Sequence, residues 1–248
     1  MPPSSIVAAF AIGVSLGLLG GGGSILTVPA LVYWVGLPPL EATTSSLVVV
    51  GLTSLSAALQ HFHGGRLQLR PALVFAGAGV PGSFAGSIVS RRIPPQALLV
   101  AFALLMAAAG VAMLLRRDYQ PAVRASLSRV IPAGLAVGIL TGVLGVGGGF
   151  LIVPALVLFA GLSMVDAVGT SVAVIAVNCA GGFAGRISAA DTVQWKLTLG
   201  FSAVAIAGSF AGAALVGRIA VRWLRRGFGA FVLAIAGYMI ASTMKAVP

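Results

Sequence analysis

Residues 17–47 read GLLGGGGSILTVPALVYWVGLPPLEATTSSL, and residues 142–172 read GVLGVGGGFLIVPALVLFAGLSMVDAVGTSV. Sliding the chain by 125 residues lays 13–47 on 138–172 without a gap, and 16 of the 35 positions are identical. At an offset of 126, GSFAG at 82–86 recurs at 208–212. The chain is therefore an internal duplication, which we divide into a first repeat at 1–115, a polar linker at 116–130 and a second repeat at 131–248.

The composition places the chain in a lipid bilayer. Of its 248 residues, 59% are hydrophobic and only 8% are charged, whereas a soluble domain carries about 25% charged residues. Charge-free intervals of about the length of one spanning helix follow one another, and they are continuously apolar instead of alternating as in a membrane barrel. We predict an all-α polytopic membrane protein. Because the first residues, MPPSSIVAAF, contain no basic region, we expect this segment to stay in the mature protein.

The glycine-rich block cuts the first hydrophobic segment, residues 4–36, into two short pieces. Each piece covers about 20 Å as a helix, which is less than the hydrocarbon thickness of about 30 Å. Two half-helices that meet at a glycine tip, as in a re-entrant hairpin, fit these lengths best. A single tilted and kinked helix is the alternative.

Each repeat then contains a glycine-tipped hairpin followed by three crossings. An odd number of crossings inverts one repeat relative to the other, as in many secondary transporters. The positive-inside rule supports this topology, since ten basic residues fall on one face and five on the other; if each glycine block were one crossing, the repeats would be parallel and the split nine to six. We therefore prefer inverted repeats with both termini outside the cytoplasm. The ten residues are Arg66, Arg70, Arg116, Arg117, Arg124, Arg129, Arg218, Arg222, Arg225 and Arg226.

The polar residues within the apolar segments favour an anion over a cation. None of the four acids lies centrally in a span, although a cation path normally needs intramembrane Asp or Glu. A half-helix that begins at Ser24 or Gly149 would present free N–H groups and the positive end of its dipole, which suits an anion. The alternative is that the glycines only permit tight helix crossings, the role we assign to the G-x-x-x-G of Gly82 and Gly86. Ser46 adds a further hydroxyl donor beside the candidate site. The candidate substrate-binding residues are Gly22, Gly23, Ser24, Thr43, Thr44, Ser45, Gly147, Gly148, Gly149, Thr170, Ser171 and Asn178.

Two further polar positions have open roles. Asn178 lies in the middle of an apolar run, where its amide either contacts a ligand or makes a hydrogen bond between helices. His61 and His63 precede Arg66 at the end of a span, and Arg186 occupies the position equivalent to His61 in the second repeat. A solvated loop is the simpler interpretation for the two histidines, and gating or proton coupling with Arg66 is the alternative.

Other function classes lack their sequence motifs. No zinc-protease, Walker or nucleophile-elbow motif is present, so we predict no enzyme, no metal and no cofactor. The basic residues lie in short loops instead of on a soluble face, which argues against nucleic acid as a partner. The single cysteine, Cys179, excludes an internal disulfide.

At the two quoted stretches, and at the loop QHFHGGR, the sequence resembles the TauE/SafE family of bacterial permeases, the sulfite exporter family. The resemblance covers nearly the whole chain. It implies a multi-pass transporter in the bacterial inner membrane, with Gly22, Gly23, Ser24, Thr44 and Ser45 lining the site together with Gly147, Gly148, Gly149, Thr170 and Ser171. Because Gly169 stands where the first repeat has Thr44, the two half-sites cannot be chemically equal.

We therefore expect a secondary transporter that exports a small oxyanion such as sulfite or an organosulfonate. Uptake or exchange of a small carboxylate is the alternative within transport. A non-transporting membrane subunit of a redox or assembly complex is the alternative from another class. The expected partners are a small anionic substrate and membrane lipid, and homo-oligomer formation is left open.

Overall fold

The computed structural model describes residues 3–115, 127–145, 148–215, 226, 230 and 233–241, and these residues are helical with short turns and contain no strand. Within these described residues, four helices are long and apolar enough to span a membrane: α3 (Pro39–His63), α4 (Leu69–Ser90), α8 (Met164–Ala184) and α9 (Trp195–Ala214). The prediction of an all-helical membrane protein is thus confirmed. α5 spans Pro95–Leu115 and α6 spans Leu127–Leu144, so α6 begins within the predicted linker, whose residues 116–126 lie outside the described part.

The first glycine block reverses the direction of the chain. After α1 (Pro3–Leu19) come a 3₁₀ segment, η1 (Gly20–Leu26), the short α2 (Thr27–Pro29) and a π-helical turn, η2 (Ala30–Trp34). Gly23 packs against the backbone of Ile12 and Leu16, and Trp34 and Val7 line the same pocket. The returning segment therefore runs beside α1. This is the hairpin we favoured from the sequence, and the kinked single helix is wrong.

The second glycine block separates α6 from α7 (Gly149–Phe159), and these two helices pack against each other. Gly145 has a φ of 68°, close to the 66° of its equivalent Gly20. This left-handed conformation strains any residue with a Cβ atom, which explains why both corners begin with glycine. The local structure then differs, because Gly148 has a φ of 62° and α7 starts directly as an α-helix, whereas the first repeat continues as a 3₁₀ segment.

Small residues let helices of the two repeats cross closely. Gly82 and Gly86 on α4 face the backbone of α6, and Gly208 and Gly212 on α9 face the backbone of α1. A Cβ atom at any of these four glycines would overlap with a carbonyl oxygen of the opposite helix. The predicted packing role of G-x-x-x-G is therefore confirmed. Each repeat also contributes one helix to each of these two pairs, so the repeats are interleaved.

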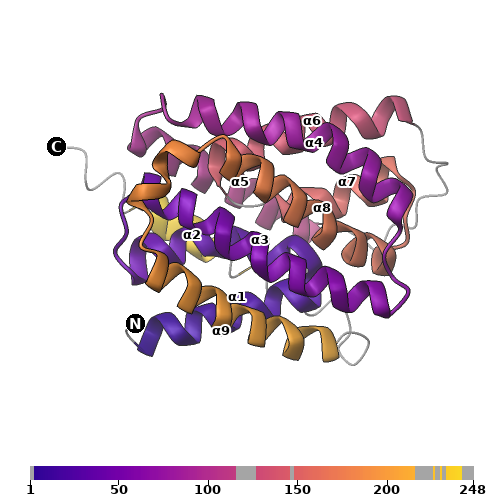
Figure 1. Ribbon diagram of the computed structural model, residues 1–248, viewed down its shortest axis with the longest axis horizontal. Helices are drawn as coiled ribbons and strands as arrows, with labels where there is room; N and C mark the ends of the chain where they lie inside the picture. The colour runs from indigo at the N-terminus through magenta and orange to yellow at the C-terminus, as the bar shows by residue number, and fades with distance from the viewer. Residues whose placement is uncertain are drawn as a thin grey trace.

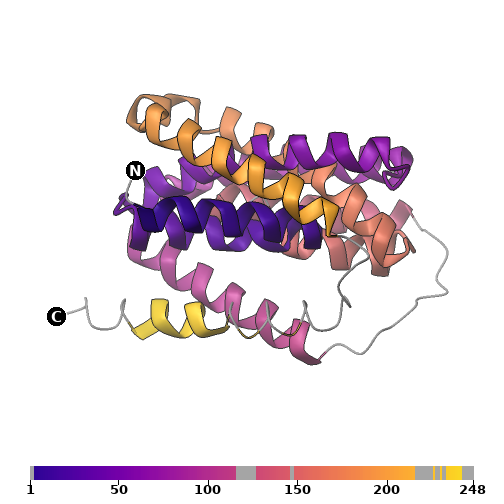
Figure 2. The ribbon, with the colours of Figure 1, turned by 90° about the horizontal axis from the view of Figure 1, so that it is seen from below.

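α3 and α8 form the centre of the molecule, between the α4–α6 pair and the α1–α9 pair (Figure 1). They run antiparallel: Thr43, near the start of α3, meets Arg186, which follows the end of α8. At the other end Gln68, which follows α3, donates its backbone N–H to Thr170 near the start of α8. α5 and residues 233–241 lie below the other helices in Figure 2.

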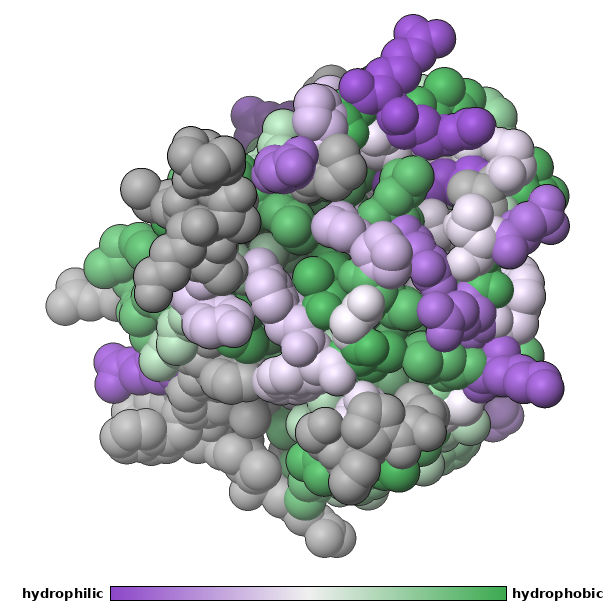
Figure 3. All heavy atoms as spheres, turned by 90° about the vertical axis from the view of Figure 1, so that its left-hand side faces the viewer, coloured by the Kyte–Doolittle hydropathy of each residue, from purple (hydrophilic) through white to green (hydrophobic). Residues whose placement is uncertain are grey.

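Apolar side chains cover the outside of the helices. Leu73 on α4 is 70% exposed, and Val7, Leu55 and Leu199 are also exposed on the faces of their helices. In lipid such side chains need no protein cover, because the acyl chains solvate them. Figure 3 looks onto one end of the molecule, where most of the strongly hydrophilic side chains lie along the top and right margins, and hydrophobic side chains are mixed with weakly polar ones in the centre.

Candidate functional site

The two glycine corners contact each other inside the molecule. A Cβ atom built on Gly21 would overlap with the backbone of Gly149, and a Cβ atom on Gly149 would overlap with Gly21. These two glycines therefore have a packing role in this conformation. The second function that the sequence suggested, in which the corner N–H groups bind an anion, stays a prediction.

A serine from the opposite repeat meets each corner. Ser46 on α3 donates a hydrogen bond to the carbonyl of Gly145, while Ser171 on α8 lies so close to Gly20 that a Cβ atom there would be 2.8 Å from the serine oxygen. Both serines are fully buried. The corner of each repeat is thus completed by the hydroxyl-rich helix of the other repeat.

The remaining predicted residues of the corners are held by local contacts. Ser24 is fully buried and donates its hydroxyl to the carbonyl of Gly21 over 2.7 Å. Gly22 and Gly23 lie in η1. Gly148 packs against the hydroxyl of Thr141, and Gly147 lies outside the described residues.

Two predicted residues are buried without hydrogen-bond partners. The hydroxyl of Ser45 and both polar atoms of the Asn178 amide have none among the described residues, and both residues are fully buried. Asn178 lies against Gly79 of α4, where a Cβ atom would be 2.5 Å from the amide oxygen. In a low-dielectric interior an unpaired amide is costly, so these atoms are available to a polar ligand.

Arg186, which the sequence analysis did not place in the site, joins the two repeats at one end of the α3–α8 pair. Its side chain is 0% exposed. The two terminal guanidinium nitrogens donate hydrogen bonds to five oxygens: Thr43 Oγ1 at 2.6 Å, Thr44 Oγ1 at 3.4 Å, Ser90 Oγ at 2.7 Å, and the carbonyls of Gly142 at 2.8 Å and Val143 at 3.1 Å. The structure thus brings together predicted residues Thr43 and Thr44, the end of α4 and the end of α6 just before the second glycine corner.

No carboxylate of the described residues forms an ion pair with Arg186. All five of these acceptors are neutral, and its Nε has no hydrogen-bond partner. Burial, with a smaller contribution from the positive charge of Arg91, lowers the pKa of Arg186 to about 10. The guanidinium therefore remains protonated at neutral pH and carries a positive charge into the protein interior.

At the opposite end of α3, His61 occupies the equivalent position. His61 is 3% exposed and lies next to the backbone of Gly17, the equivalent of Gly142, and its Nε2 has no hydrogen-bond partner in the described part of the chain. The interpretation of His61 as a solvated loop residue is wrong, because α3 continues to His63 and turns His61 inwards. His63 itself is exposed, and its Nδ1 lies 2.7 Å from the carbonyl of Leu59 on the same helix. Arg66 is half-buried, and its backbone packs on Gly169.

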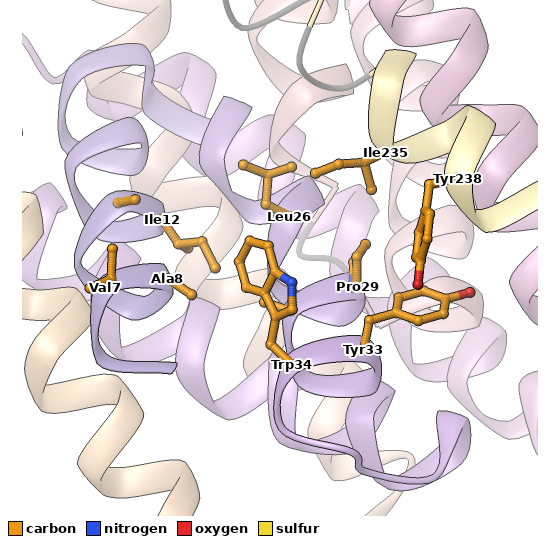
Figure 4. Close-up of a pocket in the computed structure, with 11 residues that line it drawn as sticks. Val7, Ala8, Ile12, Leu26, Pro29, Tyr33, Trp34, Ile235 and Tyr238 are labelled. Atoms are coloured by element: carbon orange, nitrogen blue, oxygen red, sulfur yellow. The ribbon is translucent and has the colours of Figure 1, made fainter. Parts of the chain in front are cut away.

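A pocket of about 410 Å³ lies elsewhere, between α1, the returning segment and residues 233–241 (Figure 4). Its lining is almost entirely apolar, with Tyr33, Trp34 and Tyr238 at one side. The rings of Tyr33 and Tyr238 stack edge to face with centroids 5.3 Å apart. Since it offers no charged group, this pocket does not suit a small oxyanion. Among the described residues, no group of three or more His, Cys, Asp or Glu could hold a metal ion.

Comparison with known proteins gives consistent matches over most of the chain. The model of the family described as "Sulfite exporter TauE/SafE" matches residues 5–239. Two proteins named "Probable membrane transporter protein", from Xylella fastidiosa strains Temecula1 and 9a5c, are 35% and 37% identical over 92% of this chain and 91% of their own length. The Bacillus subtilis protein named "Probable membrane transporter protein YdhB" is 28% identical over 74% of this chain and 78% of its own. No solved structure matches.

Proposed function

Because the chain belongs to the sulfite exporter TauE/SafE family and is a multi-pass membrane transporter, we propose that it is a secondary transporter that exports a small oxyanion such as sulfite or an organosulfonate. Its site would lie where the glycine corners meet the hydroxyl-rich starts of α3 and α8. The membrane would be the bacterial inner membrane, and the substrate is the only partner that transport itself requires.

The observation that carries this proposal is the chemistry of the buried polar groups. Among the described residues the fully buried groups are hydroxyls, the Asn178 amide, the His61 imidazole and the Arg186 guanidinium. Glu41, in the first turn of α3, is only partly buried, although its Oε1 is buried without a hydrogen-bond partner. Such an interior offers hydrogen-bond donors and positive charge. A cation would find no fully buried carboxylate among the described residues, whereas an oxyanion would find both N–H and O–H donors and a buried positive charge.

The proposed topology is that of inverted repeats. The antiparallel contact between α3 and α8, with the start of each helix at the end of the other, supports this arrangement. The positive-inside rule would then place the end with Arg66 in the cytoplasm and the end with Arg186 outside. An exported anion would enter near His61 and leave near Arg186. An interior-negative potential favours this direction by about 2.3 kcal/mol per charge per 100 mV.

Counterflow in proteoliposomes that contain only this chain tests the proposal. Vesicles preloaded with sulfite, methanesulfonate or lactate receive the same labelled anion outside, and we expect accumulation of the label with sulfite or methanesulfonate. Accumulation with lactate alone would instead favour carboxylate exchange. A folded protein that produces no flux with any of the three anions would contradict a transporter of small oxyanions and would favour a non-transporting subunit.

A further inference from the structure

The Arg186 guanidinium is a buried cation held only by neutral oxygens. Its acceptors are three hydroxyls and two carbonyls, and its Nε–H donates to none of the described residues. The charged group that acts on it most is Arg91, which has the same sign. A charge in a low-dielectric interior is stabilised fully only by an opposite charge with good hydrogen-bond geometry. An anion that reached Arg186 would supply both.

A structural role alone does not require this charge. Arg186 does satisfy the carbonyls of Gly142 and Val143 in the last turn of α6, as a capping side chain would. In the first repeat, however, the smaller His61 lies against the equivalent Gly17, so contact with this part of the backbone does not need a guanidinium. Capping does not explain why this residue is an arginine, which has a permanent charge and a planar fork of N–H donors.

The present partners of the guanidinium can be exchanged for an oxyanion. Thr43 Oγ1 donates its own hydrogen to the carbonyl of Leu40 at 2.8 Å, and Ser90 Oγ donates to the carbonyl of Ser87 at 2.8 Å. These two hydroxyls therefore present lone pairs to Arg186. An anion with two oxygens would replace them with two parallel, charge-assisted hydrogen bonds, and a rotation of each hydroxyl would then turn it into an additional donor to the anion.

We infer that Arg186 binds the transported oxyanion directly, at the end of the molecule where α3 begins and α4 and α6 end. Thr43 and Ser90 hold the guanidinium when the anion is absent and contact the anion when it is bound. The recognised group is a sulfite, sulfonate or similar group with two oxygens in reach of the guanidinium fork. This inference rests on the proposed function, because it names the residue that performs the binding step of that transport.

Binding to the purified full chain in detergent provides the test, with methanesulfonate as probe because its charge does not change near neutral pH. We expect Arg186→Gln to raise the Kd at least tenfold, whereas the exposed neighbour variant Arg91→Gln should stay within about threefold of the wild type. Arg186→His places the residue of the first repeat at this position. It should bind more tightly at about pH 5.5 than at about pH 8, because the imidazole titrates between these values, while the wild type should bind equally at both.

The outcomes separate this inference from the function on which it rests. A folded Arg186→Gln protein with wild-type Kd would overturn the role of Arg186. If this variant does not fold, Arg186→His decides: wild-type affinity at about pH 8, where the imidazole is neutral, would overturn the role, and weakened binding there supports it. A wild-type protein that binds neither methanesulfonate nor sulfite would reject the proposed function itself.

Discussion

The two ends of the α3–α8 pair make the same kind of contact with a glycine backbone, but the side chains that make this contact differ. At one end Thr43 and Thr44 accept hydrogen bonds from the buried Arg186, which also reaches the carbonyl of Gly142. At the other end His61 lies against the backbone of Gly17. The duplication has thus kept the contact with the glycine backbone and changed the side chain that makes it.

The positions next to these contacts also differ between the two repeats. Val168 and Gly169 occupy the places that correspond to Thr43 and Thr44. A Cβ atom on Gly169 would lie 2.5 Å from the carbonyl oxygen of Arg66, so a threonine would not fit there without movement of that loop. One end therefore offers hydroxyls to a fixed cation, and the other offers close backbone packing beside a titratable ring.

Comparing the two ends separates the residues that set the helix packing from the residues that carry charge and hydrogen-bonding groups. The positions that set helix separation are equivalent in both repeats: Gly17 packs on the carbonyl of Ser209, and Gly142 packs on the carbonyl of Ser83. The positions that carry charge and hydrogen-bonding capacity are not equivalent. A transporter with this arrangement would present its anion with different partners at the two ends of its path.

The largest expected effect comes from breaking the shared framework. Gly17→Ala and Gly142→Ala each place a Cβ atom on a carbonyl of the opposite helix, and relief requires the helices to separate. We expect each variant to lower the free energy of unfolding by about 3 kcal/mol or to prevent folding, as measured by SDS titration in mixed micelles. Gly77→Ala on α4 is the control, because no atom lies within 4 Å of its added Cβ. A loss in only one of the two variants would show that the repeats are not equivalent in packing.

A smaller effect should follow when the chemistry of one end is exchanged for that of the other. Thr43→Val introduces the residue found at the equivalent position 168 and removes the 2.6 Å hydrogen bond from Arg186. We expect a loss of about 1.5–3 kcal/mol, the range for a hydrogen bond to a charged group. The reverse change, Val168→Thr, should stay within about 0.5 kcal/mol, since the hydroxyl can bond to its own helix. Equal effects of the two variants would refute the asymmetry.

The sequence predicted the helix packing well because small residues at regular spacing mark the close helix crossings of a membrane protein. The repeat, the hairpin at the first glycine block and the close crossings at Gly82 and Gly208 follow from spacing and from helix length. The sequence analysis placed His61 at the end of a span but did not show that the helix continues to His63. That continuation is what turns His61 into the interior.

The chemistry of the candidate site was predicted less completely. Arg186 follows the end of a span, where an arginine is usually a topology signal, and its inward direction depends on the turn after α8 and on hydroxyls from two helices of the other repeat. The signal that could have pointed to it was its alignment with His61. The mutual contact of Gly21 and Gly149 was not predicted either, because the sequence alone does not bring two turns 128 residues apart together.

We expect the smallest effect in the middle of the α3–α8 pair, where Asn178 corresponds to Thr53. The Thr53 hydroxyl donates to the carbonyl of Val49 over 2.7 Å, whereas both polar atoms of the Asn178 amide are unpaired. Asn178→Thr would allow the same bond within α8 and remove an unsatisfied amide, so we expect the free energy of unfolding to rise by about 1 kcal/mol. A second measurement shows whether the amide is kept for a ligand. If it is, the rise in Tm caused by sulfite or methanesulfonate should shrink in this more stable variant; an undiminished rise would assign Asn178 to packing alone, and the middle of the path would then have no amide contact with the anion.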